Sequence, residues 1–361
     1  MSEKKFIFEN NISNDRIDIY AEPDVRIKKL KSENENEFRI EIEGKSVDYS
    51  VVNALRRTVL LYIPVYAFHR SNIFIEVDKS RNMYNNDLIY NQIETLPIFD
   101  IPNFFDLENP EIFLPTEVMK KLFGVFVKEK YTEEIEEENK PVDNDKKLFK
   151  IELSLNVKNN TGNDKFVSTH DAVLKVDGKI SNSYMTRKPI CILVLKPSED
   201  ISLRAEANLG ISKMHAAYEA TTNAMHEEIT SMKYHLWYET LEQLDKNIIF
   251  TKACIILIKK LENLRNFIKK KYSEEQNIPD MVEIELYGEE HTLGNLLSTV
   301  LQKCDAIEKA GYYMPHPFID KITVKYQLNT KSKVGPIQIF VDCVDYLIKL
   351  FQTIANTVHK K

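Results

Sequence analysis

The stretch that decides the fold is GEEHTLGNLL, residues 288–297, because a second version of it, GKSVDYSVVNALRR, occupies residues 44–57. Each copy begins at a glycine that follows a short segment of alternating apolar and polar residues, 38–43 and 282–287. Such alternation predicts a half-buried strand. The sequence therefore predicts one strand–turn–helix unit twice in the chain. The alternative is that two α+β units look alike by chance.

A helix is predicted after each turn. Ser50 is expected to cap the first helix through its hydroxyl group, and Pro64 to end it. Thr292 opens the second helix in the same way. Asn53 and Asn295 follow three positions after these hydroxyl residues, one turn into each helix. A short amide there can bond a loop or strand end and fix the angle between strand and helix; the alternative is a tolerated polar residue.

Length and composition restrict the class of protein. The chain has 361 residues, 43% of them hydrophobic, and a net charge of −6, which suggests two or three domains and no broad basic surface for nucleic acid. Its four cysteines are scattered without a Cys-x-x-Cys pair, which favours reduced thiols over disulfides or zinc. We see no signal peptide and no apolar run long enough to cross a membrane. A soluble, intracellular protein is expected.

Other sequence patterns predict a loop, a linker and two long helices. Residues 128–147 are strongly acidic and predict a solvated loop, and residues 273–280 are polar, contain a proline and predict a linker. A long amphipathic helix is predicted from 248 to 268. The last helix carries apolar residues at alternating steps of four and three, a seam that needs a partner helix. That seam includes Ile337, Val341, Val344, Ile348 and Phe351.

Several motifs together resemble the dimerisation pair of multisubunit RNA polymerases. VNALRR (52–57) followed by YIP (62–64) resembles the larger partner, and EHTLGNLL (290–297) with PHP (315–317) resembles the smaller one. The pair comprises the amino-terminal domain of the bacterial alpha subunit, the archaeal D and L subunits, and the third-largest and eleventh subunits of eukaryotic polymerase II. Three central motifs resemble the insert domain of the larger partner: LVLKP (193–197), ISLRA (201–205) and GISKMHA (210–216).

The resemblance spans roughly residue 38 to the carboxyl end, and a fused arrangement of this kind resembles the version used by large nucleocytoplasmic DNA viruses. It implies an α+β fold with two alpha-like dimerisation domains that form an internal pseudo-heterodimer. Residues 1–64 and 229–272 correspond to the larger partner and 281–361 to the smaller. Residues 65–228 form an inserted, mostly β domain. The cysteine cluster of some eukaryotic insert domains is absent.

Interface residues follow from the same motifs. By resemblance, Arg56 and Arg57 bind the second-largest, beta-like polymerase subunit, for which the planar guanidinium is well suited; the alternative is a solvated basic pair. His291 is expected to be a hydrogen-bonded structural histidine, because a helix N-terminus disfavours its charged form. The expected interface set is completed by Asn53, Leu55, Thr292, Asn295, Leu296, Leu297 and the seam of the last helix.

Candidate catalytic patterns are weak. Residues 143–145, DND, lie in the acidic segment without an ordered frame. His226 with Glu227 is not a zinc-peptidase motif, because Thr230 stands where the second histidine belongs. Residues 210–213, GISK, have the wrong spacing for a phosphate loop. We therefore expect no catalytic, cofactor-binding or metal-binding residues.

The function implied is a non-catalytic assembly scaffold of DNA-directed RNA polymerase. The expected partners are the largest (beta-prime-like) and second-largest (beta-like) subunits and a small tenth-subunit-like protein, with DNA reached only through the complex and no membrane. The resemblance to viral forms implies a viral factory in the host cytoplasm and packaging in the virion. The alternative is a free-standing dimeric regulatory or nucleic-acid-binding module.

Overall fold

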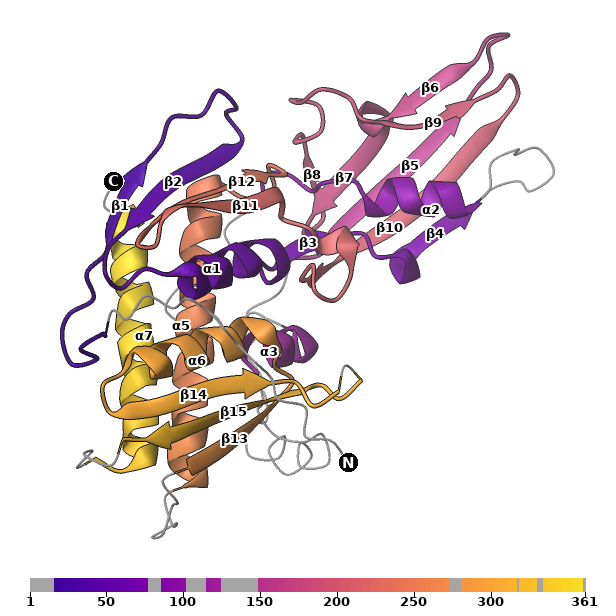
Figure 1. The fold of residues 1–361 in the computed structure, drawn as a ribbon. Coiled ribbons are helices and arrows are strands. Elements are labelled where there is room, and N and C mark those ends of the chain that lie inside the picture. Colours follow the sequence, from indigo (N-terminus) through magenta and orange to yellow (C-terminus); the bar gives the residue numbers. More distant parts are fainter. Residues whose placement is uncertain are drawn as a thin grey trace.

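The computed structural model describes residues 16–76, 86–101, 115–124, 149–272, 281–316, 318–329 and 334–359. Figure 1 shows a body in which two shorter helices lie between two sheets and two long helices run past both sheets, and a β-rich part that extends away from it. The predicted acidic loop, 128–147, and the predicted linker, 273–280, lie outside the described residues. The mixture of helices and sheets confirms the predicted α+β class.

The first sheet of the body has the strand order β1-β2-β12-β11, with every neighbouring pair antiparallel. In β2 the alternating residues Phe38, Ile40 and Ile42 are buried, as the sequence predicted. Because side chains alternate between the two faces of a strand, this pattern presents one apolar face to the helices. The strands are β1 (Arg26–Lys29), β2 (Glu37–Glu43), β11 (Thr221–Thr230) and β12 (Lys233–Thr240).

Helix α1 (Tyr49–Leu61) follows β2, and its cap differs from the prediction. Asp48, not Ser50, occupies the N-cap: its Oδ1 accepts hydrogen bonds from the backbone N–H groups of Ser50 at 2.8 Å and Val51 at 3.1 Å. The helix therefore begins one residue earlier than Ser50, which is itself buried. Asp48 and Ser50 are both residue types that cap helices. Asp48 has the extended backbone of an N-cap residue, so it caps α1 in place of Ser50.

The second unit repeats the order of strand and helix. Strand β13 (Met281–Tyr287) leads into helix α6 (His291–Lys303), and β14 (Ile307–Tyr313) and β15 (Lys321–Leu328) follow. The antiparallel sheet has the order β13-β15-β14, and α6 packs on β14 and β15. Glu290 occupies the N-cap position of α6, but its side chain makes no capping hydrogen bond. Thr292 therefore lies inside the first turn and does not cap the helix.

Two long helices run through the body. They are α5 (Lys246–Lys271), capped by Asp245, and α7 (Pro336–His359). They pack along one another, and α6 also contacts α7 (Figure 1). The predicted seam faces this packing: Val341, Val344, Ile348 and Phe351 are buried, and Ile337 at the start of α7 is half-buried. Fully burying an aliphatic side chain contributes roughly 1.5–3 kcal/mol, so this seam is a major source of stability.

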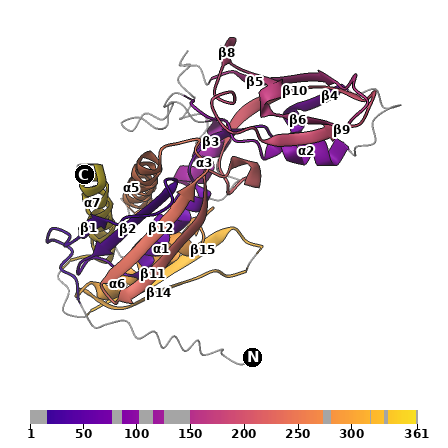
Figure 2. The ribbon, with the colours of Figure 1, turned by 90° about the horizontal axis from the view of Figure 1, so that it is seen from above.

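The β-rich part is built around strand β10 (Asp200–Gly210). One edge of β10 pairs with both β3 (Val65–Ala67) and β4 (Ile73–Glu76), and the other pairs with β5 (Ile151–Lys158). Seen from above, this part stands to one side of the body (Figure 2). Its other elements are β7 (Ala172–Val176) and β8 (Lys179–Ser181) beyond β5, the pair β6 (Lys165–Ser168) and β9 (Cys191–Leu195), helix α2 (Asn86–Glu94), and the short helices η1 (Arg70–Asn72), η4 (Thr169–Asp171) and η5 (Ala216–Tyr218).

Helix α3 (Thr116–Phe123) follows α2 in the chain and packs on α5. The predicted domain boundary between 228 and 229 falls inside β11, whose partner is β12 in the first sheet. Strand β11 was missed because its second half is exposed and its register is shifted, so the alternation that reveals a strand is weak.

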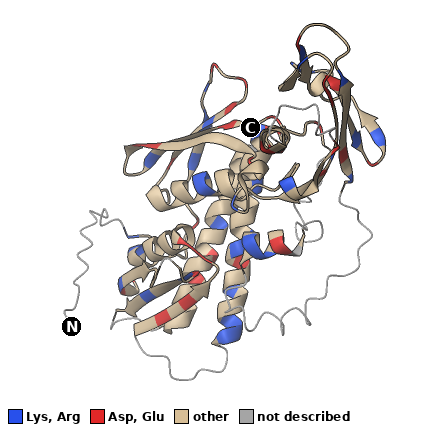
Figure 3. Ribbon diagram, turned by 90° about the vertical axis from the view of Figure 1, so that its right-hand side faces the viewer, with Lys and Arg blue, Asp and Glu red and all other residues tan. Residues whose placement is uncertain are grey.

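Lysines and arginines are interspersed with aspartates and glutamates in the view of Figure 3. On the second sheet, Lys325 pairs with Glu283 directly opposite and Lys321 pairs diagonally with Glu285, so that cross-strand ion pairs lie on its outer face. Among the described residues, no helix is long and apolar enough to cross a membrane.

Candidate subunit interface

The predicted interface residues gather on three helices that pack together. Arg56, Arg57, Asn53 and Leu55 lie on α1; His291, Thr292, Asn295, Leu296 and Leu297 lie on α6; the seam lies on α7. Helix α1 packs on α5 and α6, and α6 packs on α7. Leu55, Leu296 and Leu297 are at most 1% exposed, so they belong to the core between the helices.

The side chain of Arg57 joins the two strand–turn–helix units. Its Nε donates to Thr292 Oγ1 at 2.5 Å, and its Nη2 lies 3.5 Å from Glu290 Oε2. Both partners stand at the start of α6. The predicted pair of arginines is therefore divided, because the charge of Arg57 is already paired with a carboxylate within the chain.

Arg56 points to the other side of α1. Its Nε and Nη2 donate to Asn53 Oδ1 at 3.2 and 2.9 Å, and its Nη1 donates to the backbone oxygen of Ala224 on β11 at 3.4 Å. Asn53 thus holds an arginine and does not reach a strand end. Burial and, secondarily, the charge of Arg57 lower the pKa of Arg56, which remains a cation at neutral pH.

His291 and Gly294 of α6 both meet Tyr312 of strand β14. His291 is exposed, its Nδ1 lies 3.3 Å from Tyr312 Oη, and the two rings meet edge to face with centroids 5.9 Å apart. A Cβ atom on Gly294 would lie 2.4 Å from Tyr312 Cδ2. The glycine of the HTLGN motif is therefore required by close packing of this ring. Asn295 is half-buried, and its backbone oxygen accepts from Ser298 Oγ at 3.1 Å.

Glu290 is the centre of a group of charges from three elements. Lys213, which follows β10, lies 3.0 Å from its Oε1 and also donates to Tyr62 Oη at 3.1 Å. Burial raises the pKa of Glu290, but the hydrogen bond from Lys213 and the charges of Lys213, Arg57 and Lys260 outweigh it and hold the pKa below its ordinary value. The carboxylate is therefore ionised at neutral pH and attracts all three cations.

A pH dependence follows from this depressed pKa. Stability from Glu290 is fully present above its ordinary pKa of 4.5 and is lost as the pH falls through the lower pKa of the folded state. We expect Glu290→Gln to be less stable than the wild type at pH 7 and the difference to shrink as the pH falls below 4.5. Urea unfolding of both proteins between pH 7 and 3.5 measures this. A difference that stays constant over that range would contradict the role of the carboxylate charge.

One buried and one partly buried ion pair connect the units, and neither was predicted. Lys260 Nζ on α5 lies 2.8 Å from Glu289 Oε1 and 2.9 Å from Oε2; only the contact with Oε2 has hydrogen-bond geometry, and the side chains are 8% and 4% exposed. Lys303 Nζ at the end of α6 lies 2.7 Å from Asp48 Oδ2 at the start of α1. One signal was available: Lys260 falls on the apolar stripe of α5, between Leu257 and Leu261.

Further hydrogen bonds fix the two units together. Tyr346 on α7 donates to Ser46 Oγ at 2.7 Å in the β2–α1 turn, and both groups are buried. Near the amino end of the described chain, Arg16 donates to the backbone oxygen of Cys304 at 3.0 Å, and Tyr20 donates to Asp342 Oδ2 at 2.9 Å. Contacts from the first unit therefore reach both α6 and α7.

The space between these helices is small. A cavity of about 20 Å³ is lined by residues of α1, α5 and α6, among them Tyr62, Lys260, Glu289 and Leu293. That volume admits a water molecule but no nucleotide. Apolar packing and ion pairs at this site therefore hold α1, α5 and α6 together.

Comparison with known proteins agrees with this geometry. The chain is 58% identical over 349 residues, 97% of its length, to a protein of Acanthamoeba polyphaga mimivirus that is named as a DNA-directed RNA polymerase subunit; the match covers 98% of that relative. The chain belongs to the family of DNA-directed RNA polymerase subunits. Residues 281–357 match the RNA polymerase Rpb3/Rpb11 dimerisation domain, and this region contains β13, α6, β14, β15 and most of α7.

Shorter relatives match the second unit alone. The Rpo11 subunit of Saccharolobus shibatae is 40% identical over 73 residues, which are 20% of this chain and 70% of that protein. The RPAC2 subunit of RNA polymerases I and III from Caenorhabditis briggsae is 34% identical over 76 residues, 21% of this chain and 51% of that protein. The recognition of a fused, D/L-type polymerase subunit is thereby confirmed, and its viral character rests on the mimivirus relative.

Proposed function

We propose that this subunit is a non-catalytic assembly scaffold in which two alpha-like halves form an internal pseudo-heterodimer and nucleate the association of the two large polymerase subunits. The observation that carries the proposal is the set of ion pairs between the halves: Lys260 with Glu289, which is buried, and Lys303 with Asp48 and Arg57 with Glu290, which are partly buried. Fusion in one chain fixes the ratio of the halves and gives each a high effective concentration of the other.

The proposed domain division follows the sheets. The larger-partner half comprises the amino-terminal segment through α1 together with β11, β12 and α5, and the smaller-partner half comprises 281–361. The inserted β domain lies between them in the sequence. We move its second boundary from 228 to the residues before β11, because β11 pairs with β12 in the sheet of the larger-partner half.

We further propose that the beta-like subunit binds what we call the α1–β11 surface: Tyr49, Arg56, Met225 and Ile229. Strand β11 is an edge strand of the sheet, and Tyr49, Met225 and Ile229 are 51%, 51% and 44% exposed. Aromatic residues, methionine and arginine are enriched at protein interfaces. Arg57 is removed from this role, because its charge is paired with the Glu290 carboxylate within the chain, whereas Asn53 and the Ala224 carbonyl, which Arg56 contacts, are neutral.

The remaining partners are proposed by family resemblance. They are the beta-prime-like subunit, reached by another face of the same body, and a small tenth-subunit-like protein; DNA is approached only through the complex. The mimivirus relative supports a viral setting, in which the complex acts in a cytoplasmic factory and is packaged in the virion.

Co-expression of the tagged chain with the two largest polymerase subunits of the same genome tests the scaffold role. We expect both large subunits to co-elute with the chain. Arg56→Glu places a negative charge on the α1–β11 surface and is expected to reduce capture of the beta-like subunit at least about tenfold, because like charge and lost bidentate bonding both act against the contact.

The matched control is Arg26→Glu. Arg26 lies on β1 at the opposite edge of the same sheet, and its side chain is 72% exposed. This variant should capture both subunits as the wild type does. Equal capture by Arg56→Glu would move the interface elsewhere. A wild-type chain that elutes as a free dimer with neither large subunit would refute the scaffold proposal and favour the free-standing regulator.

A further inference from the structure

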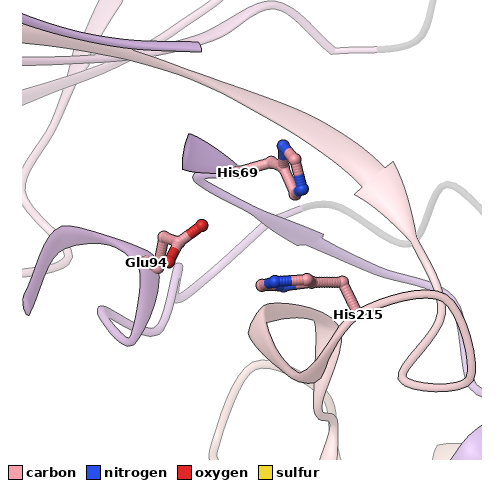
Figure 4. A group of neighbouring side chains, drawn as sticks. All are labelled: His69, Glu94 and His215. Carbon is pink, nitrogen blue, oxygen red and sulfur yellow. The ribbon is translucent and has the colours of Figure 1, made fainter. Parts of the chain in front are cut away.

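Three side chains with metal-binding groups converge where the β-rich part joins the body. His69 lies between β3 and η1, Glu94 ends helix α2, and His215 precedes η5. One ligand atom from each residue lies within 4.8 Å of the others, and Figure 4 shows the carboxylate directed toward the space between the two rings. No metal site was predicted from the sequence, since these residues are far apart and form no spacing motif.

Each of the three groups is anchored by a local hydrogen bond. Glu94 Oε1 accepts from the backbone N–H of Arg70 at 2.8 Å, which leaves Oε2 as the ligand atom. His69 Nδ1 lies 2.8 Å from Ser71 Oγ, and His215 Nδ1 accepts from the backbone N–H of Ala217 at 3.2 Å. In both rings Nε2 is therefore the atom left for an ion. Such anchoring orients ligands before a metal binds.

Metal binding requires one particular tautomer of each histidine, and adopting it costs hydrogen bonds. An ion needs the lone pair of Nε2, so the proton of each neutral ring must lie on Nδ1. For His69 this allows Nδ1 to donate to Ser71 Oγ, but it removes the 3.3 Å bond that Nδ1 accepts from the backbone N–H of Ser71. For His215 it removes the 3.2 Å bond from Ala217, which is already near the long end of the normal range. The site gives up two long hydrogen bonds, one at each histidine, in exchange for two metal–nitrogen bonds.

The simpler explanation is that the two histidines only cap their short helices. Capping accounts for both Nδ1 atoms, but it does not require the rings to meet. Their centroids are 4.9 Å apart at an angle of 76°, and Glu94 joins them from a different helix. His69 and Glu94 are half-buried while His215 is exposed, so an ion could enter from solvent and keep water ligands.

We propose that His69, Glu94 and His215 bind a divalent transition-metal ion, with Zn²⁺ as the best fit. Two imidazoles and one carboxylate are a ligand set that zinc takes in proteins, with the fourth position left to water. The ion would fasten the end of α2 to the segments that follow β3 and β10, which is a structural role at the junction. Because it binds the folded state, it should raise thermal stability.

The test uses the full chain, stripped with a chelator and dialysed into metal-free buffer. Titration with zinc chloride in a calorimeter should show one equivalent bound, and zinc should raise the melting temperature. His215→Asn is expected to weaken binding at least about tenfold, as loss of a ligand costs no less than loss of a supporting group. Asparagine is a strong N-cap, so this variant keeps the η5 turn capped.

His316→Asn is the matched control. His316 Nδ1 accepts from the backbone N–H of Phe318 at 3.1 Å, which is the same capping geometry, and His316 does not belong to the three-residue group. This variant should bind zinc as the wild type does. The proposal is overturned if the wild type takes up no stoichiometric zinc, if His215→Asn binds it equally well, or if His316→Asn shows the same loss.

Discussion

Replacing Lys260 with methionine is expected to lower the stability of the body by about 3–5 kcal/mol, because it leaves the carboxylate of Glu289 buried without its countercharge. The side chain of Glu289 is only 4% exposed, so water cannot substitute for the lost ammonium group. For a domain of about 150–250 residues this corresponds to a fall in melting temperature of about 6–20 °C. Thermal and urea unfolding, followed by circular dichroism, measure it.

Two further variants isolate the cause. Lys260→Met combined with Glu289→Met removes both charges and should recover most of the lost stability, since two apolar side chains replace a buried pair at little cost. Lys259→Met changes the neighbouring position on α5, where the ammonium lies 3.3 Å from Glu262 and is 31% exposed; its effect should stay below about 1 kcal/mol. A single Lys260→Met variant as stable as the wild type would contradict the buried pair.

This contact also marks the limit of prediction from the sequence. Strands β2, β13 and β15 and helices α5 and α7 were predictable, because each carries a local periodicity that its buried face requires. The pairing of Lys260 with Glu289 depends on how α5 crosses the turn before α6. No local pattern contains that crossing, although a lysine on an apolar helix stripe signalled that a partner was needed.

The two arginines show the same limit within one motif. Adjacent helix positions point about 100° apart, so Arg56 and Arg57 had to face different surroundings. Resemblance to the family identified both as interface residues but could not distinguish them. The structure does so, because α6 lies on the side of Arg57 and β11 on the side of Arg56. The motif predicted that both arginines lie on one helix. Which element packs beside each arginine depends on the tertiary structure, which no local pattern contains.

Gly44→Ala is the second substitution from which a large loss is expected. Gly44 has φ +151°, and a Cβ atom there would lie 2.1 Å from the backbone oxygen of Asp24 and 3.0 Å from Val25 Cα. Backbone atoms cannot move aside as a flexible side chain can. Strain and overpacking together predict a loss of about 3 kcal/mol or more. The soluble yield and the urea midpoint should both fall.

Gly288 is the natural comparison, because it occupies the same place in the second strand–turn–helix unit. It has φ +73°, and a Cβ atom there would meet nothing within 4 Å. Gly288→Ala should therefore cost only the left-handed backbone, about 1–2 kcal/mol. Asparagine tolerates that conformation, so Gly288→Asn should cost less than Gly288→Ala, whereas Gly44→Asn should be as damaging as Gly44→Ala.

The difference between the two glycines has a structural cause. The segment that leads into β1 crosses the first turn: Ser46 N donates to Asp24 O at 3.3 Å, and Arg26 pairs with Glu43 on β2. In the first unit the glycine is thus required by close packing of two backbones, and in the second by its own conformation. Equal, small losses for Gly44→Ala and Gly288→Ala would show that the segment before β1 does not pack closely over the first turn. The strand–turn–helix repeat would then be symmetric in its surroundings as well as in its sequence.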